Sequence, residues 1–405
     1  MLSGRPAKCK GLVFPADRNE YGGVVGMRIL IHALALYKGG GGSRHFEGLV
    51  RTLGRIDHEN EYILCLNSRF EFEIQYPNIM IYRVKIRSLF HRLWWDQMIL
   101  PRLALKHGVD VVVALFVFGM FRPVVSQIVF QRNPQFYCDI YLSKLRGRAA
   151  LEMILRRRMA YLTMCASRII VTPSAAMRDM IRRYHPDLPP DRFRVLPHGF
   201  EREQLSRQPL PEPIAYQLTR LQGKPMILYV SHLEPHKGHE VAVRAMRELK
   251  RQGQPACLYL TMDRRDWPKG YDRLMVKIHE WGLEDDIINL GRVPEGALAE
   301  LYRRADVFFF PSFCESFGFP LVEAMAHGLP IVAADTAINR EMCGKAALYY
   351  PPFDSVAAAQ RLSTLLSSPE RRQQMRAASE RQFPKSHLCW SDYASRFLKL
   401  LKNSL

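Results

Sequence analysis

The sequence lacks the cysteine patterns of a zinc-binding or disulfide-stabilised protein. Its eight cysteines are scattered over 405 residues, without a CxxC pair or a Cys/His cluster at the spacing of a zinc site. Long apolar runs are lacking too: the longest, 111–121, is well short of the roughly 18–20 residues of a membrane-spanning helix. The first 26 residues carry no secretory signal. We therefore expect a cytoplasmic chain with reduced thiols.

Acidic residues are scarce relative to basic ones. The chain has 58 Lys and Arg against 39 Asp and Glu, a formal net charge of +19. Such an excess favours an anionic partner, which could be nucleic acid, an acidic membrane surface or a phosphorylated substrate. The basic run Arg156, Arg157 and Arg158 is also compatible with a solvated helix face. Because no RNA or DNA module with interleaved basic and aromatic residues is seen, we expect no nucleic-acid partner.

Apolar runs alternate with amphipathic stretches along most of the chain. Strands are expected at 27–33, 62–66, 79–84, 111–115, 127–130, 168–172, 193–196, 226–230, 256–261, 287–290, 307–310, 331–334 and 347–349. This alternation, with near-continuous apolar strands, predicts parallel sheets covered by helices on both faces.

The length and the pattern predict two domains. Residues 1–26 have no periodic pattern and are expected to be a disordered leader, with Met27 opening the first strand. A proline-rich stretch at 201–225 has the composition of a linker. We therefore expect domains at 27–205 and 206–385, and a closing amphipathic helix at 386–405.

One stretch, 307–335, carries the strongest chemical signal. It reads as a buried strand, a loop with Glu315 and Gly318, and a helix that begins near Pro320 and contains Glu323. A helix start offers unpaired N–H groups and a positive dipole end, which suit a diphosphate. Both carboxylates could face one pocket and accept hydrogen bonds from sugar hydroxyls, or they could only stabilise the helix dipole.

A second loop places cations at a helix start. Strand 226–230 leads to His232, Lys237 and a helix that begins near Gly238. Because cations oppose the dipole at this end of a helix, the pattern suggests a bound anion.

The motif P-S-x-x-E-S-F-G-x-P-L-V-E-A-M-A closely resembles the E-x7-E motif of the retaining GT-B glycosyltransferases of family 4. The resemblance implies that Glu315 lies near hydroxyls of the transferred sugar and that Glu323 binds the ribose. The backbone of Ser316, Phe317 and Gly318 would then receive the diphosphate.

Further marks of the same family occur elsewhere, of which those outside the Lys237 loop are weaker. Lys237 matches a lysine that binds the diphosphate, and His232 stands where the family commonly has an arginine. By position, Gly41 and Gly42 belong to a glycine loop that approaches donor and acceptor, Arg292 and Val293 contact the base, and Glu341 matches a further glutamate that is structural or functional. Many members also carry a histidine–aspartate pair near the reacting sugar, and Arg132 or Asn133 is the candidate replacement here.

The resemblance implies a GT-B fold, in which two Rossmann-like α/β domains face each other across a cleft with a C-terminal crossover helix. It implies transfer of a hexose from a UDP-, GDP- or ADP-sugar to a glycan or lipid-linked acceptor with retention of configuration. No DxD triplet is present, and we expect no obligatory metal. Lys237, Glu315 and His232 are the expected catalytic residues. The alternatives are a sugar-nucleotide epimerase, a phosphorylase and a basic nucleic-acid-binding protein.

A basic and aromatic segment suggests peripheral contact with an anionic membrane. It contains Arg83, Lys85, Arg87, Arg92, Leu93, Trp94, Trp95, Met98, Ile99 and Leu100. Basic residues beside aromatic ones suit a membrane interface, although apolar residues at this spacing also form helix cores.

Overall fold

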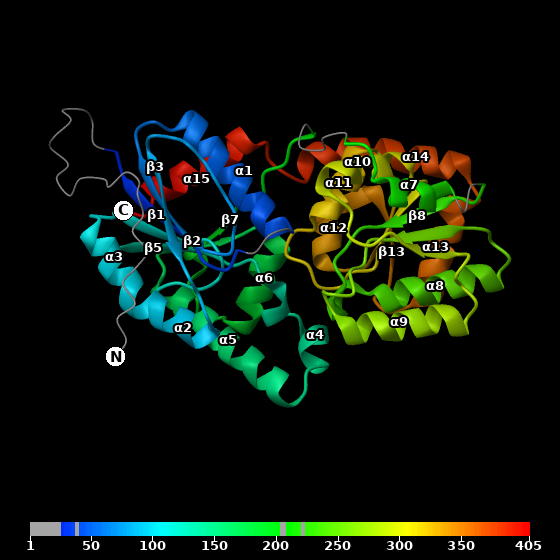
Figure 1. Cartoon of the computed structure of the whole chain (residues 1–405), viewed down its shortest axis with the longest axis horizontal. Coiled ribbons are helices and arrows are strands. Elements are labelled where there is room, and N and C mark those ends of the chain that lie inside the picture. Colours follow the sequence, from blue (N-terminus) through cyan, green and yellow to red (C-terminus); the bar gives the residue numbers. More distant parts are fainter. Residues whose placement is uncertain (1–25, 37–39, 203–207, 220–222) are drawn as a thin grey trace.

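The computed structural model describes residues 26–36, 40–202, 208–219 and 223–405. They form two α/β halves side by side, each with a parallel sheet between layers of helices (Figure 1). The expected leader lies outside the described residues except for Gly26.

The first sheet has the strand order β3-β2-β1-β4-β5-β6-β7, with all neighbours parallel. Its strands are β1 Arg28–Ala33, β2 Glu61–Asn67, β3 Ile79–Val84, β4 Val111–Ala114, β5 Ser126–Phe130, β6 Ile169–Thr172 and β7 Phe193–Val195. Its helices are α1 Gly41–Ile56, α2 Leu89–Trp94, a π-helix at Trp95–Ile99, α3 Leu100–Lys106, α4 Asp139–Ser143, α5 Gly147–Ala166 and α6 Ala175–Tyr184.

The second sheet has the order β10-β9-β8-β11-β12-β13, again parallel throughout. Its strands are β8 Met226–Tyr229, β9 Cys257–Leu260, β10 Ile287–Asn289, β11 Val307–Phe310, β12 Ile331–Ala334 and β13 Ala347–Tyr350. Its helices are α7 Glu212–Thr219, α8 His239–Arg251, α9 Pro268–Glu280, α10 Glu295–Arg304, α11 Phe319–Ala326, α12 Ala337–Cys343, α13 Ser355–Leu366 and α14 Pro369–Gln382.

Every strand falls within one residue of its expected position, and the expected fold class is confirmed. The strands are recognisable because parallel strands are buried on both faces and so read as continuous apolar runs.

The expected linker contains a helix, so its reading as linker alone is wrong. Helix α7 lies in it, and Ile214 and Leu218 are buried in the core of the second half. Pro213 is tolerated because it sits in the first turn, where its missing N–H costs nothing. The i, i+4 spacing of the two apolar residues then gives the helix a buried face.

Helix α15, at Trp390–Lys402, returns to the first half of the chain and packs on α1 (Figure 1). Trp390 is 1% exposed and lies in the core of the first sheet. The ring fits because two residues against it are glycines: a Cβ would lie 2.2 Å from the ring at Gly48 and 2.3 Å from it at Gly199. This close approach fixes the crossover helix.

Replacing this tryptophan tests how much the crossover contributes to stability. Trp390→Ala should lower the free energy of unfolding by about 3–5 kcal/mol, because it leaves a cavity in a packed core. Arg396→Ala, on the exposed face of the same helix, is the control and should change it by less than about 0.5 kcal/mol. Urea unfolding gives both values, and equal stabilities would show that α15 does not fasten the first half.

Candidate active site

The site is built on loops that follow the carboxyl ends of strands in both sheets. Loops after β8 and β11 carry Lys237 and Glu315, and the loop after β1 carries the glycines that open α1. Ligands of open parallel sheets bind at this edge.

Gly318 shapes the loop between β11 and α11. Its φ of 89° is left-handed, a conformation that glycine adopts without strain. The chain then turns into α11, where the Leu321 N–H donates to the Gly318 carbonyl at 2.9 Å. No acidic residue lies in the first turn of α11 and no side chain of the described residues caps it, so its positive end is available to an anion. Phe317, beside this turn, is buried.

Lys237 and Glu315 form an ion pair. The Lys237 Nζ is 2.7 Å from Glu315 Oε1, and the two side chains are 20% and 12% exposed. Burial alone would lower the pKa of Lys237, but the Glu315 carboxylate outweighs it and the pKa is raised. Burial and the charge of Lys237 lower the pKa of neighbouring His236 to about 2, so Lys237 is the cation of this loop.

The pair corrects one step of the sequence argument. A cation at the start of α8 suggested a bound anion, but the structure supplies that anion from within the chain as Glu315. A lysine at a helix start is therefore not by itself a sign of a ligand here.

Glu323 has different partners from Glu315. It is 2% exposed on α11 and accepts a hydrogen bond from the Tyr302 hydroxyl at 2.6 Å. Its other oxygen is paired with Arg44 of α1, which also pairs with Glu295. The two glutamates thus have separate cations rather than one shared set of contacts.

His232 and Arg292 meet at a common carboxylate. His232 Nδ1 lies 3.5 Å from Asp266 Oδ2, and Arg292 Nη2 lies 3.2 Å from Asp266 Oδ1. The His232 side chain is 50% exposed, whereas Val293 is buried. The expected diphosphate and base residues of this region are therefore connected through Asp266.

The glycine segment of the first half lies against the second half. A Cβ at Gly41 would be 2.8 Å from Phe319 at the start of α11, and one at Gly40 would be 3.6 Å from His232 Nε2. Gly42 faces Phe116, with 3.2 Å to a Cβ. Side chains on Gly41 would thus separate the two halves.

Two further contacts join the halves. The Ser174 hydroxyl donates to the Ser316 carbonyl at 2.8 Å. Glu341 accepts from the backbone N–H groups of Ala175 and Ala176 at 2.8 and 2.6 Å. Glu341 therefore stabilises the amino end of α6 from across the interface, a structural contact.

Sequence reasoning missed Arg44 and Tyr302, the partners of Glu323. Arg44 directly follows the glycine run that ends at Ser43 and could have been noted for that reason. Tyr302 carries no comparable signal, because an apolar position on an amphipathic helix explains it equally well.

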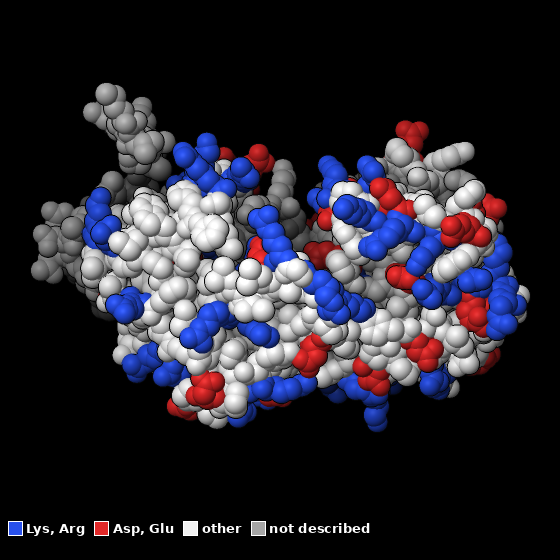
Figure 2. Space-filling view, turned by 90° about the horizontal axis from the view of Figure 1, so that it is seen from below, with Lys and Arg blue, Asp and Glu red and all other residues white. Residues whose placement is uncertain are grey.

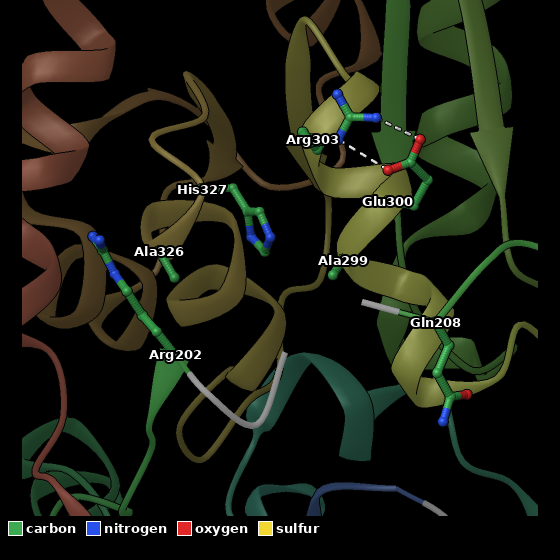
Figure 3. A pocket seen from close by; sticks show the side chains of 7 residues that line it. All are labelled: Arg202, Gln208, Ala299, Glu300, Arg303, Ala326 and His327. Atoms are coloured by element: carbon green, nitrogen blue, oxygen red, sulfur yellow. Dashed lines mark hydrogen bonds and ion pairs between the residues drawn. The ribbon is translucent and has the colours of Figure 1, made fainter. Parts of the chain in front are cut away.

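A cavity of about 220 Å³ lies beside α10 and the carboxyl end of α11 (Figure 3). Its lining residues are Arg202, Gln208, Ala299, Glu300, Arg303, Ala326 and His327. His327 stacks on Tyr302, with ring centroids 5.2 Å apart, and Arg303 is held by Glu300. None of the expected site residues lines this cavity.

The described residues contain neither a metal-binding cluster nor a membrane-spanning helix. In the described part of the chain, no three His, Cys, Asp or Glu side chains are grouped to hold a metal ion. Among the same residues, no helix has the length and apolarity to cross a bilayer.

Charged loops that meet between two parallel α/β halves define a protein of the GT-B class. The family model described as "Glycosyl transferases group 1" matches residues 214–382, and the one described as "Glycosyltransferase Family 4" matches residues 39–204. The chain belongs to these group 1 glycosyltransferases.

Individual relatives are more distant. A D-inositol 3-phosphate glycosyltransferase of Nocardia farcinica is 30% identical over 42% of this chain and 38% of its own length. The O-antigen chain mannosyltransferase B of Escherichia coli is 31% identical over 47% and 49%. The chain thus spans about half or less of these relatives. The structure of Anabaena Alr3699/HepE in complex with UDP-glucose covers 93% of this chain and 100% of that one, at 15% identity and a TM-score of 0.69.

Removing Lys237 tests the ion pair. Lys237→Ala should abolish turnover and also lower the free energy of unfolding by about 3 kcal/mol, because Glu315 is left buried without its cation. Lys237→Ala/Glu315→Gln should recover much of that stability but not the turnover. Thermal unfolding and release of nucleoside diphosphate measure the two effects. Near-wild-type turnover of the single variant would remove Lys237 from the site.

Proposed function

We propose that this protein transfers a hexose from a nucleotide sugar to a glycan or lipid-linked acceptor with retention of configuration. The observation that carries the proposal is the Lys237–Glu315 pair beside the open amino end of α11. A cation and unpaired N–H groups at one place suit a leaving diphosphate, and a carboxylate beside them suits sugar hydroxyls.

In this mechanism the protein works by position and charge. Lys237 and the start of α11 stabilise the negative charge that develops on the leaving phosphate, and Glu315 orients the sugar. His232 lies beside the glycine segment, with its Nε2 3.6 Å from a Cβ placed at Gly40, and we assign it to the same phosphates. We propose that no metal is obligatory, so that EDTA should leave turnover unchanged.

The substrate class is supported by the relatives. One is named a mannosyltransferase of O-antigen chains, another acts on an inositol phosphate by its name, and the Anabaena structure holds UDP-glucose. A thermal-shift panel of UDP-, GDP- and ADP-sugars tests the donor. Formation of an epimer without acceptor would favour an epimerase, and phosphate-dependent cleavage of a glycan would favour a phosphorylase.

The two glutamates should have separable kinetic effects. Glu323→Gln should mainly raise the KM for the donor, because a ribose contact is equal in ground and transition states. Glu315→Gln should mainly lower kcat, because the sugar changes shape and charge during transfer. Each effect should be roughly ten- to a hundred-fold, the value of a hydrogen bond to a charged group.

The matched control is Glu300→Gln, on the neighbouring helix α10, whose carboxylate pairs with Arg303 and Arg304. Its steady-state constants should equal those of the wild type. Unchanged kcat and KM in both glutamate variants would refute the roles given to them.

We also propose that the first half contacts the cytoplasmic face of an anionic membrane. Phe90 and Trp94 of α2 are 74% and 53% exposed, and Leu151 and Ile154 of α5 are exposed as well. Leu93 of α2 and Met153 of α5 pack on the same buried cluster. On this face the N-terminal half shows a broad uncharged area edged by Lys and Arg, with few acidic residues (Figure 2).

Part of the expected membrane segment belongs to the core instead. Arg92, Trp95 and Leu100 are buried, and Arg92 lies over the Phe118 ring and 3.5 Å from Asp96. Lys85 and Arg87 remain exposed. The surface for lipid is thus smaller than the sequence suggested, and it includes α5.

Liposome flotation tests this surface. The wild type should float with vesicles of phosphatidylglycerol and phosphatidylcholine, and much less with phosphatidylcholine alone. Phe90→Ala/Trp94→Ala should lose most of the bound fraction. Tyr216→Ala/Val276→Ala, which removes two exposed apolar side chains from the other half, should not. Equal, negligible binding to both kinds of vesicle would refute membrane contact.

A further inference from the structure

Arg132 is a largely buried cation at the edge of the site. It follows β5 at the carboxyl end of the first sheet. Its Nη1 lies 3.0 Å from His45 Nδ1, its Nη2 donates to the Gly41 carbonyl at 3.4 Å, and its guanidinium stacks 5.0 Å from the centre of the Phe116 ring.

None of these contacts neutralises the guanidinium charge. Among the described residues, no carboxylate pairs with Arg132, whereas Arg44 and Lys237 each have one. The groups around it are basic or neutral. His45 and His198 are buried with ring centroids 4.3 Å apart, and the Tyr393 hydroxyl lies 2.6 Å from His45 Nε2.

Burial determines the charge of this cluster. It lowers the pKa of His45 and His198 well below the usual range, so both rings are neutral. It lowers the pKa of Arg132 to about 10, which still leaves a cation at neutral pH. A charge removed from water without a counter-ion is unfavourable. The folded protein is therefore less stable than it would be with an anion bound beside Arg132.

The backbone beside Arg132 favours an anion as well. Gly41 is the first residue of α1, which has no acidic residue in its first turn and no side-chain cap. The amino end of this 16-residue helix, the positive end of its dipole, thus lies beside the guanidinium, whose Nη2 donates to the Gly41 carbonyl. His198, whose Nδ1 has no partner among the described residues, stacks at 5.3 Å on Phe319 at the start of α11.

We propose that Arg132 and the amino end of α1 bind a phosphate group of a substrate. The inference rests on the proposed function, which brings two possible sources of that group. One is the donor diphosphate, reached across the glycine segment that separates Arg132 from His232. The other is a phosphate on the acceptor. In the first case Arg132 contacts, from the first half, the same diphosphate that Lys237 contacts from the second. In the other case the anion is separate from the Lys237–Glu315 pair.

The test compares Arg132→Gln and Arg132→Lys with Arg192→Gln. Arg192 is a matched control because it too is partly buried, donates to backbone carbonyls at Cys165 and Ser167, and lies at the opposite edge of the same sheet. Isothermal titration with UDP, GDP and ADP probes the donor phosphates. Protection against thermal unfolding by inorganic phosphate, added with saturating nucleoside diphosphate, probes the acceptor side.

Arg132→Gln should weaken one of the two bindings by roughly ten-fold or more, the range of a hydrogen bond to a charged group. Arg132→Lys should restore part of it, and the control should leave it unchanged. Loss in the titration identifies the donor as the source, and loss of phosphate protection identifies the acceptor. Without ligand, Arg132→Gln should not lower the melting temperature, because it removes an uncompensated charge.

The inference is overturned if both bindings are unaffected, or if the wild type shows no response to any of the phosphates. It is also overturned if Arg132→Gln only lowers the ligand-free melting temperature, which would mark a structural arginine. If no nucleoside diphosphate binds the wild type but inorganic phosphate protects it through Arg132, the donor assignment fails and the phosphate site stands.

Discussion

The buried carboxylate of Glu323 is the contact on which the arrangement of the two halves depends. Arg44 reaches it from α1 in the first half, while Tyr302 holds it within the second. Further contacts extend the same interface, from Ser174 to Ser316 and from Glu341 to α6. These contacts are polar, as in interfaces between domains that move relative to each other.

This interface has a consequence for donor binding. A ribose on Glu323 in the proposed complex would take over a hydrogen bond that Arg44 now provides. One charged hydrogen bond then replaces another, so the net free energy gained on binding is lower than that of the new contact alone. Donor binding and the contact between α1 and α11 are thereby linked, because both use one carboxylate.

Local features could be predicted from the sequence, and long-range pairings could not. The strands could be recognised because nearly every residue in them is apolar. Gly318 and Lys237 could be recognised because their immediate neighbours in sequence indicate a loop and the start of a helix. The pairing of Arg44 with Glu323 joins positions 279 apart, and no local pattern encodes it. Helix α7 was missed because the prolines around it indicate a linker more strongly than Ile214 and Leu218 indicate a helix. These two residues are buried by packing on the core of the second half, which the local sequence does not show.

Comparison of the two cations of the site shows that the lack of a counter-ion indicates a ligand, whereas a position near the start of a helix does not. Lys237 and Arg132 both lie where a helix begins, and position alone would assign each an anion. Lys237 is already neutralised by Glu315, so its environment is satisfied before any substrate arrives. Among the residues that the structure describes, Arg132 contacts only imidazole, carbonyl and aromatic groups. The free energy that binding of a phosphate can recover is therefore greater at Arg132, since there no ion pair among the described residues has to be broken first.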